Sequence, residues 1–161
     1  MPAKKVAWPL AINLIRGKSE RNTFGIVRKF ANGSPKPHQG WDFSAPIGTT
    51  VYAIADEKVE FIKNIGDYGL QLCLSFQFDG ATHYAFYAHL KTTSVAVGAA
   101  VKMRDAVAAT GNSGNANTLP SGEDHLHFEV RTKLNPGAGL AGRISPFRIY
   151  KICPLKVPAV G

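Results

Sequence analysis

The chain has 161 residues, of which 45% are hydrophobic, and 19 Lys and Arg against 11 Asp and Glu give it a net charge of +8 at pH 7. This length indicates one domain with enough apolar residues for a core, and no apolar stretch is long enough to span a membrane. The charge favours an anionic partner such as nucleic acid, a membrane surface or a bacterial cell wall. The same charge can simply keep a protein soluble, so charge alone does not choose among these partners. The basic residues are scattered and form no nucleic-acid-binding motif, and we expect neither nucleic acid nor a membrane as partner.

The N-terminal segment, MPAKKVAWPLAINLIRGKSE, has two lysines before a short apolar run that a proline interrupts. A signal peptide needs an apolar stretch of about 7–15 residues followed by a cleavage site. The segment has no clean example of either, so the sequence predicts no signal peptide.

The segment KPHQGWDFSAP contains His38 and Asp42, separated by three residues. Its prolines and Gly40 favour turns that can direct both side chains toward one point. Imidazole nitrogen and carboxylate oxygen are both ligands of Zn²⁺. The pair is therefore a candidate for part of a metal site, although the spacing alone occurs by chance in many proteins.

The middle of the chain has the patterns of β-strands, at residues 51–55, 58–65, 70–78 and 81–90. LQLCLSFQF at 70–78 alternates strictly, which predicts its leucines and phenylalanines on one face and Cys73 on the other. Asp79-Gly80 then supplies a two-residue hairpin turn. Cys73 and Cys153 form no spaced metal motif, and the sequence leaves open whether they form a disulfide.

The strand after this turn, ATHYAFYAHL, carries two histidines. Alternation places His83, Ala85, Tyr87 and His89 on one face. His83 would lie roughly 20 Å from His89 along an extended strand, too far to serve the same site. We therefore interpret His83 as an ordinary strand histidine.

The stretch GEDHLHFEV at 122–130 places two further histidines in an alternating pattern. His125 and His127 fall on one face, roughly 7 Å apart, while Leu126 and Phe128 point to the other face and the core. Both imidazoles can reach one point in front of the sheet, although a pair of solvated surface histidines has the same pattern. Glu129 shares their face and could be a surface charge, so we assign it no catalytic role.

Four of the five histidines thus fall in patterns that can converge on one site. His38, Asp42 and either His125 or His127 would supply three protein ligands, the number typical of catalytic zinc. The remaining histidine of the pair would then be free to transfer protons. His89, at a strand end, is the fourth histidine of the group.

These motifs occur in the order of a known family. The chain resembles the lysostaphin-type, LytM-like zinc endopeptidases, which cut the peptides of bacterial peptidoglycan. The family's His-x-x-x-Asp, Tyr-Ala-His-Leu-like strand and His-x-His are matched at 38–42, 87–90 and 125–127. DFSAPIGTTVYA at 42–53 and ATGNSG at 109–114 follow the family order as well, so the resemblance covers residues 6–150.

The resemblance implies a mainly β fold. We expect an antiparallel β-sheet or sandwich of the LytM-like type, a duplicated hybrid motif with long loops around a groove, over residues 6–150. Residues 151–161 would form an extended C-terminal tail, and the whole stretch after Ser145, with its three prolines, would be an extended strap. NANTLPSGED at 115–124 and KLNPGAGLAG at 133–142 are expected to be loops that bear on peptide specificity.

The resemblance also implies the roles of the site residues. His38, Asp42 and His127 would bind zinc, and His89 and His125 would be the unligated catalytic pair. Zinc would activate water and polarise the scissile carbonyl. One histidine would take a proton and return it to the leaving amine, and the other would hydrogen-bond the developing oxyanion. The sequence does not divide these two roles between His89 and His125.

We therefore expect a zinc-dependent endopeptidase that hydrolyses peptide cross-links of peptidoglycan, at a D-Ala to diaminopimelate bond or at a glycine bridge. One alternative is a catalytically silent wall-binding or amidase-activating module, which the complete set of site residues argues against. Another is a histidine phosphocarrier of related hybrid fold, an analogy that gives Asp42 no role.

The expected partners are peptidoglycan peptide stems, and the expected place of action is the cell wall or periplasm. We expect a monomer. With no export signal seen, we expect it to be delivered as an antibacterial effector by a specialised secretion system or released as a phage-type lysin. A third possibility is a chain from which the signal has been removed. An effector would have a cognate immunity protein that occludes the groove near His38 and His127.

Overall fold

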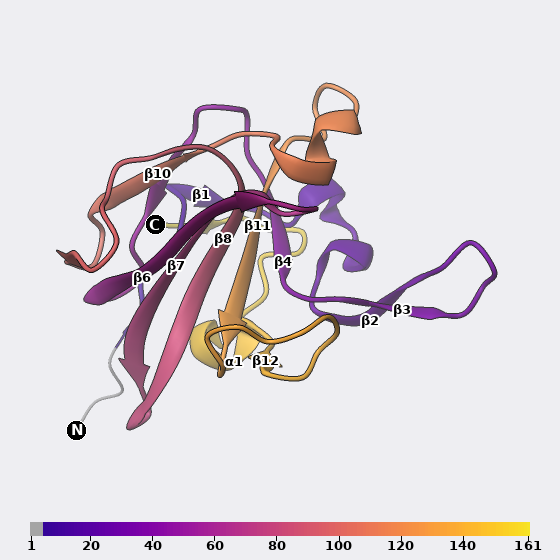
Figure 1. Cartoon of the computed structure of the whole chain (residues 1–161). Coiled ribbons are helices and arrows are strands. Elements are labelled where there is room, and N and C mark those ends of the chain that lie inside the picture. Colours follow the sequence, from indigo (N-terminus) through magenta and orange to yellow (C-terminus); the bar gives the residue numbers. More distant parts are fainter. Residues whose placement is uncertain (1–4) are drawn as a thin grey trace.

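Nine antiparallel strands form the central sheet of the computed structural model, which describes residues 5–161 (Figure 1). In chain order they are β4 (Trp41–Ser44), β5 (Thr50–Tyr52), β6 (Glu57–Ile65), β7 (Gly69–Phe78), β8 (Ala81–Thr93), β9 (Ala100–Val101), β10 (Ala106–Thr110), β11 (His125–Arg131) and β12 (Arg143–Ile144).

Smaller elements surround this sheet. β2 (Gly25–Lys29) and β3 (Pro35–His38) form a hairpin that projects from the body of the molecule in Figure 1. β1 (Ile12–Asn13) pairs with β13 (Ala159–Val160). The helical elements are short: η1 (Arg16–Lys18), η2 (Glu20–Asn22), η3 (Gly114–Thr118) and α1 (Phe147–Tyr150).

The order of the strands places the histidine-bearing segments next to one another. The path is β12-β11-β8-β7-β6-β9, with β4 also paired to β11 and β5 joined through β10. His127 on β11 lies opposite Asp42 on β4 and opposite Ala88 on β8. Segments separated by more than 80 residues in the chain therefore meet in three adjacent strands.

The apolar core occupies one side of this sheet. Leu72 and Leu74 of β7 and Phe128 of β11 are fully buried in it, which confirms the alternation predicted for both strands. Trp41, fully buried beside Tyr150 and Phe43, packs in this core as well. The opposite side of the sheet holds a small apolar cluster around Cys73.

The hairpin turn at Asp79-Gly80 is also as predicted. Both residues have positive φ, 49° and 74°, and the flanking residues Phe78 and Ala81 pair directly. Two consecutive positive φ angles match the right-handed twist of the strands that they join. The strand bounds differ at the ends: β5 stops at Tyr52 rather than at residue 55, and β8 continues to Thr93.

Strand β8 changes face before His89. Ala85 and Tyr87 lie on the core side, and Ala88 lies on the other. Between Tyr87 and Leu90 the pairing with β7 shifts by one residue, and His89 has a φ of 58°. This bulge turns His89 to the side of Ala88. The prediction that His89 shares a face with Ala85 and Tyr87, and so with His83, is therefore wrong, because strict alternation ends at the bulge.

The sequence suggested an extended strap after Ser145, and this prediction is wrong for its first part. Residues 147–150 form the helical turn α1, where Ile149 is buried against the core. After it, β13 pairs with β1 near the other end of the chain. Burying Ile149 against the sheet favours the turn over an extended strap.

The two cysteines do not form a disulfide: Cys73 is buried in the sheet and Cys153 is exposed. Within residues 5–161, no helix has the length and apolar character needed to cross a membrane. The first four residues of the basic N-terminal segment lie outside the described part.

Candidate metal centre and groove

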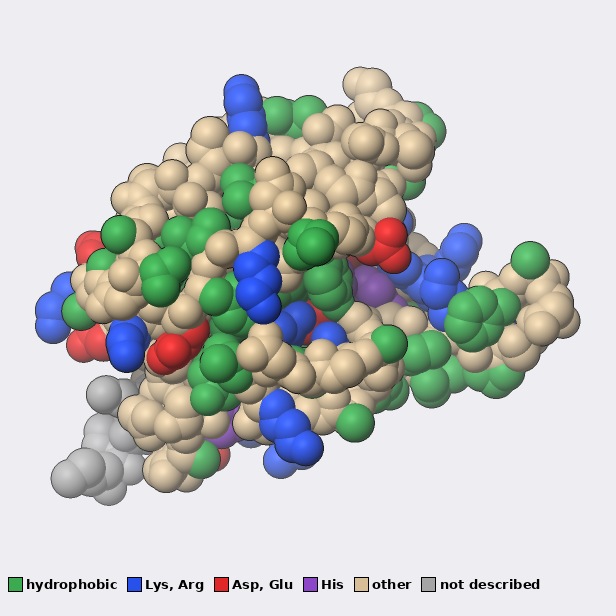
Figure 2. All heavy atoms as spheres, in the orientation of Figure 1, with side chains coloured by type: hydrophobic (Ala, Val, Ile, Leu, Met, Phe, Trp, Pro, Cys, Tyr) green, Lys and Arg blue, Asp and Glu red, His purple; other side chains and the backbone are tan. Residues whose placement is uncertain are grey.

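A groove of about 760 Å³ lies against the polar face of β11 and β8. All five candidate site residues line it, and Figure 2 shows a histidine side chain in the hollow beside the projecting hairpin. Both loops predicted from the sequence contribute to its walls, through Asn115, Leu119 and residues 135–139. This volume is typical of ligand-binding clefts.

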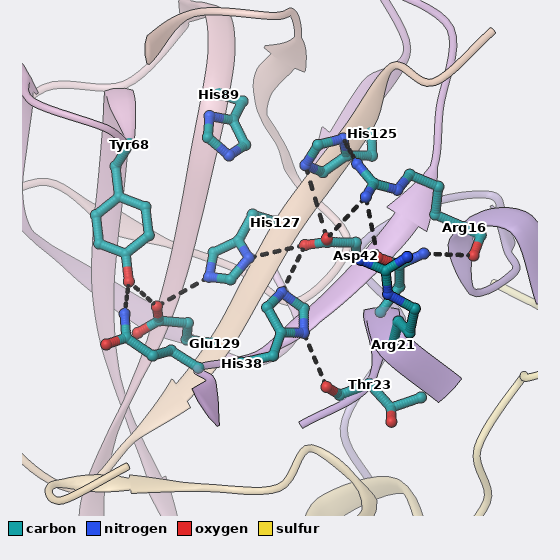
Figure 3. A network of polar contacts seen from close by, with 12 residues as sticks. Arg16, Arg21, Thr23, His38, Asp42, Tyr68, His89, His125, His127 and Glu129 are labelled. Carbon is teal, nitrogen blue, oxygen red and sulfur yellow. Dashed lines mark hydrogen bonds and ion pairs between the residues drawn. The ribbon is translucent and has the colours of Figure 1, made fainter. Parts of the chain in front are cut away.

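His38, Asp42 and His127 meet at the base of the groove (Figure 3). The Nε2 atom of His38 lies 3.2 Å from Oδ1 of Asp42, and Nδ1 of His127 lies 2.8 Å from the same oxygen. All three residues are buried, and their ligand atoms lie within 4.8 Å of one another. The structure therefore assembles a group of two imidazoles and one carboxylate.

Hydrogen bonds orient the two histidines of this group. Nδ1 of His38 donates to the backbone oxygen of Thr23 at 2.8 Å, and Nε2 of His127 donates to Oε1 of Glu129 at 2.9 Å. Each bond keeps a proton on the outer nitrogen and points the inner nitrogen at Asp42, where a bound metal would take the place of the hydrogen bond to Asp42. Histidine ligands in metalloproteins are commonly held in this way.

The turn between His38 and Asp42 depends on Gly40. A Cβ atom at this position would lie 2.2 Å from the backbone oxygen of Phe128 on β11. No side chain fits there, because the contact is with backbone that cannot move independently. Gly40 thus allows the segment from β3 to β4 to lie close against β11 and brings His38 to the side of His127.

Glu129 is fully buried, so the interpretation of this residue as a surface charge is wrong. Its Oε2 accepts from Nε of Arg131 and Nε of Arg143, each at 2.7 Å, while Oε1 accepts from His127 and from the hydroxyl of Tyr68. Burial alone would raise the pKa of Glu129, but His127 and the two arginines hold it well below the usual range. Glu129 therefore anchors His127 as a carboxylate.

Tyr68 extends this network toward the groove wall. Its ring stacks on that of His127, with centroids 5.3 Å apart. The side-chain amide of Gln39 donates to the Tyr68 hydroxyl, and Oε1 of Gln39 accepts from the backbone of Gly139 at 2.6 Å. The loop at 133–142 is thus tied to the segment that carries the metal ligands.

His89 reaches the groove from β8. Its Nδ1 donates to the backbone oxygen of Ser113 at 2.8 Å. Burial, together with the charges of His127 and His125, lowers the pKa of His89 to about 4. His89 is therefore neutral at pH 7, with its proton on Nδ1 and an acceptor nitrogen at Nε2.

His125 lies between His89 and Asp42. Its ring centroid is 5.0 Å from that of His89, and its Nε2 is 3.8 Å from Oδ2 of Asp42. On the other side of the ring, Nδ1 is 2.9 Å from Nη1 of Arg16 and 3.0 Å from the backbone oxygen of Glu123. One neighbour is a donor and the other an acceptor, so either tautomer of His125 has a partner.

Arg28 joins Arg16 beside the triad. Its Nη2 donates to Oδ2 of Asp42 at 3.1 Å and to Oδ1 of Asn22 at 2.9 Å. Arg16 donates to the same oxygen of Asn22 at 3.0 Å. The second carboxylate oxygen of Asp42 is thereby held, while Oδ1 faces the two histidines.

The charges of the triad depend on one another. Burial alone would raise the pKa of Asp42, but hydrogen bonds from His127 and His38 hold it well below the usual range. Burial would lower the pKa of His127, but hydrogen bonds to Asp42 and Glu129 raise it to about 9. Asp42 is therefore ionised at neutral pH, as a metal ligand must be.

The donor set fits zinc. Two atoms that bind one tetrahedral zinc ion at about 2.0–2.1 Å lie roughly 3.4 Å apart. The separations of 3.2 and 2.8 Å between the imidazole nitrogens and Oδ1 of Asp42 are close to this value. Three candidate ligands beside two further histidines in one groove are the arrangement typical of metal-dependent hydrolases.

The model of Peptidase family M23 matches residues 36–137, and the chain belongs to this family. The matched range includes all five candidate site residues. The chain thus belongs to a peptidase family and carries a buried His/Asp/His group that fits zinc.

Individual relatives show the same likeness. The chain is 34% identical over 104 residues to the peptidoglycan DD-endopeptidase ShyB of Vibrio cholerae. This match covers 65% of this chain and 22% of ShyB. A zinc containing peptidase from Vibrio cholerae has a TM-score of 0.65 at 30% identity, over 80% of this chain and 37% of that one. The catalytic domain of lysostaphin from Staphylococcus simulans has a TM-score of 0.62 at 30% identity, and the match covers 81% of this chain and 90% of that one. The chain spans 30% or less of the length of the curated relatives compared with it.

The structure brings together every residue that the sequence nominated for the site, and it leaves His83 apart, near Phe76 and Phe78. Sequence reasoning missed the contributions of Glu129, Tyr68 and Arg16. A signal existed only for Glu129, because it follows His125 and His127 at the same two-residue spacing on the same strand face.

Proposed function

We propose that this chain hydrolyses peptide cross-links of bacterial peptidoglycan, with His38, Asp42 and His127 as zinc ligands and His89 and His125 as the catalytic pair. The observation that carries the proposal is the convergence of a buried group of two histidines and one aspartate with two further histidines in one groove. Similarity to ShyB, a peptidoglycan DD-endopeptidase, supports the choice of substrate.

The two unligated histidines supply the proton transfers. Zinc, when bound, supplies a Lewis acid for a peptide carbonyl and for water. His89 presents an unprotonated Nε2 and is suited to accept a proton from the attacking water and to return it to the leaving amine. When Nδ1 of His125 accepts from Arg16 instead of donating to the backbone oxygen of Glu123, the proton of His125 lies on Nε2. In that form it donates a hydrogen bond to the developing oxyanion.

Digestion of purified peptidoglycan tests the proposal. Wild type should convert cross-linked dimers to monomers, as read by chromatography and mass spectrometry, and should contain one zinc. His38→Ala should lose both zinc and activity, whereas His89→Ala should keep zinc and lose about 100-fold or more in rate. His83→Ala, at the histidine outside the groove, is the matched control and should behave as wild type.

Other results would contradict the proposed function or its site assignment. A zinc-loaded chain that binds the wall but leaves all cross-links intact would be the silent wall-binding or amidase-activating module. A chain that binds no metal would contradict the ligand assignment. Product masses would also distinguish a D-Ala to diaminopimelate bond from a glycine bridge.

Action as a delivered antibacterial effector or as a phage-type lysin stays a prediction, as do action in the cell wall or periplasm and the monomeric state. Co-expression provides the test of the effector hypothesis. The chain, sent to the periplasm of a susceptible cell, should lyse it, and a cognate immunity protein should restore growth and block access to His38 and His127.

A further inference from the structure

The groove has a surplus of positive charge that the metal site does not explain. Six basic residues line it against two acidic ones, Asp42 and Asp67; the basic residues are Arg16, Arg28, Lys36, Lys63, Arg131 and Arg143. Bound zinc would add to this surplus. Figure 2 shows basic side chains around the hollow. A groove of this kind concentrates anionic ligands.

Most of these cations are paired with carboxylates, but in the described part of the chain Lys36 and Lys63 are not, and Nζ of Lys63 has only a long contact of 3.5 Å with the amide oxygen Oδ1 of Asn135. Arg131 and Arg143 pair with Glu129, and Arg28 pairs with Asp42. Lys36 and Lys63 are exposed, and within residues 5–161 neither ammonium group forms an ion pair with a carboxylate.

Each of these two lysines lies over an aromatic ring that also lines the groove. The Nζ atom of Lys63 is 4.3 Å from the ring centroid of Phe61, and Nζ of Lys36 is 5.4 Å from that of Phe30. Cation–π contact holds an ammonium group near the ring without neutralising it. Each pair therefore offers a positive charge beside an apolar surface.

The two lysine–phenylalanine pairs stand on opposite sides of the catalytic histidines. Lys36 lies on β3, which leads into β4, and Lys63 lies on β6. The strands β11, β8 and β7 separate β4 from β6. Four steps between neighbouring strands span roughly 19 Å, about the length of a six-residue extended peptide. A peptide with two well-separated carboxylates therefore matches the two lysines better than a single carboxylate does.

We propose that the pairs Lys36–Phe30 and Lys63–Phe61 bind an anionic cross-link peptide across the groove, each lysine holding a different free carboxylate on either side of the scissile bond. The inference rests on the function proposed above and narrows its substrate. It favours stem peptides whose glutamate and diaminopimelate carboxyl groups are free over amidated stems and over neutral glycine bridges.

Binding measurements on two matched ligands test the inference. The ligands are a cross-linked stem-peptide dimer with free carboxyl groups and the same dimer amidated at its glutamate and diaminopimelate residues. Zinc-loaded full-length His89→Ala, expected not to turn them over, is titrated by calorimetry at low and high salt. The free-acid dimer should bind about tenfold more tightly at low salt, and the difference should shrink at high salt.

Charge reversal locates the effect. Lys36→Glu and Lys63→Glu, each made in this background, should weaken binding of the free-acid dimer by about three- to tenfold and leave the amidated dimer unaffected. Lys58→Glu is the matched control, because Lys58 is exposed on the same strand as Lys63 but does not line the groove. Equal affinity for the two dimers, or an equal effect of Lys58→Glu, would overturn the inference.

A third ligand tests whether the groove binds polyanions in general, and a cleavage assay separates failure of the proposed function from failure of this inference. If a short single-stranded DNA of equal charge bound as tightly as the free-acid dimer, the groove would be a general polyanion site and the inference would fail. Cleavage is followed with zinc-loaded wild type. Selective binding without cleavage would sink the proposed function alone, whereas cleavage of both dimers with equal affinity would sink this inference alone.

Discussion

Strand β11 has two faces that are shielded from solvent to nearly the same degree. Leu126, Phe128 and Val130 on one face are 0% exposed, and His125 and His127 on the other are 4% and 5% exposed. The first face is held by packing against apolar neighbours, which tolerates changes that conserve volume. On the second face most polar atoms have a specific partner, because a buried polar group without one is costly. Equal burial thus produces a core on one face and a chemically defined site on the other.

The largest effect should come from the apolar face. Phe128→Ala removes a fully buried ring that contacts Phe43 and Tyr87. The free energy of unfolding in urea should fall by about 3–5 kcal/mol, the usual cost of such a cavity. Whatever protein remains folded should still bind one zinc. Loss of zinc at full stability would contradict the separation of the two faces.

A change on the polar face should have its main effect on the metal. Glu129→Gln keeps an acceptor for His127 but removes the charge that pairs with Arg131 and Arg143. Zinc affinity, measured by competition with a chelator, should fall by about 10–100-fold. Glu60→Gln is the control, since Glu60 contacts Ser75 outside the groove. Unchanged zinc affinity in Glu129→Gln would show that Glu129 does not position His127.

Glu57 is a buried carboxylate that, within residues 5–161, forms no ion pair with a cation. Its Oε1 accepts from the backbone of Ile54 and Ala55, but Oε2 has no partner, and burial raises the pKa to about 8. Between the ordinary glutamate pKa of about 4.3 and this value, the folded chain holds a proton that the unfolded chain releases. The free energy of unfolding should therefore fall as the pH rises from about 4.5 to 8, and level off above.

Glu57→Gln should remove this part of the pH dependence. Urea unfolding of wild type and variant at pH 5 and pH 9 measures the difference: the variant should lose less stability between the two pH values. Groups in the metal site contribute equally to both proteins and cancel in the comparison. Parallel pH profiles would mean that Glu57 is ionised in the folded state.

The smallest effect is expected at His83, which lies on β8 and away from both faces of β11. Its Nδ1 lies 3.2 Å from the backbone oxygen of Ala81, at the hairpin end of β8. His83→Ala should change stability by no more than about 0.5 kcal/mol. Zinc content, measured by atomic absorption, should match wild type, and a loss of zinc would place His83 in the site after all.

Much of this fold follows from local patterns. Alternation in residues 70–78 and 125–130 predicts the strands and their apolar faces, and Asp79-Gly80 predicts the turn, because these signals act between neighbouring residues. The ordered motifs around His38, Asp42 and His127 identify the family and nominate the residues that gather in the groove. Their roles as ligands and catalysts stay predictions until metal content and activity are measured.

Local patterns did not predict the helical turn at 147–150 or the direction of His89. The turn forms because Ile149 packs on a core built from distant strands. His89 faces the groove because a bulge in β8 reverses the alternation, and its Nδ1 finds the oxygen of Ser113 on another loop.

The sequence by itself determined the long strands of the central sheet, the turn at Asp79-Gly80, the family and the identity of the five candidate site residues. Only the tertiary structure decided that Glu129 is buried and bound to two arginines, that Arg16 reaches His125, and that Lys36 and Lys63 line the same groove. The physical reason is that burial and pairing depend on contacts between segments far apart in the chain. No periodicity within one segment can specify its partner in another.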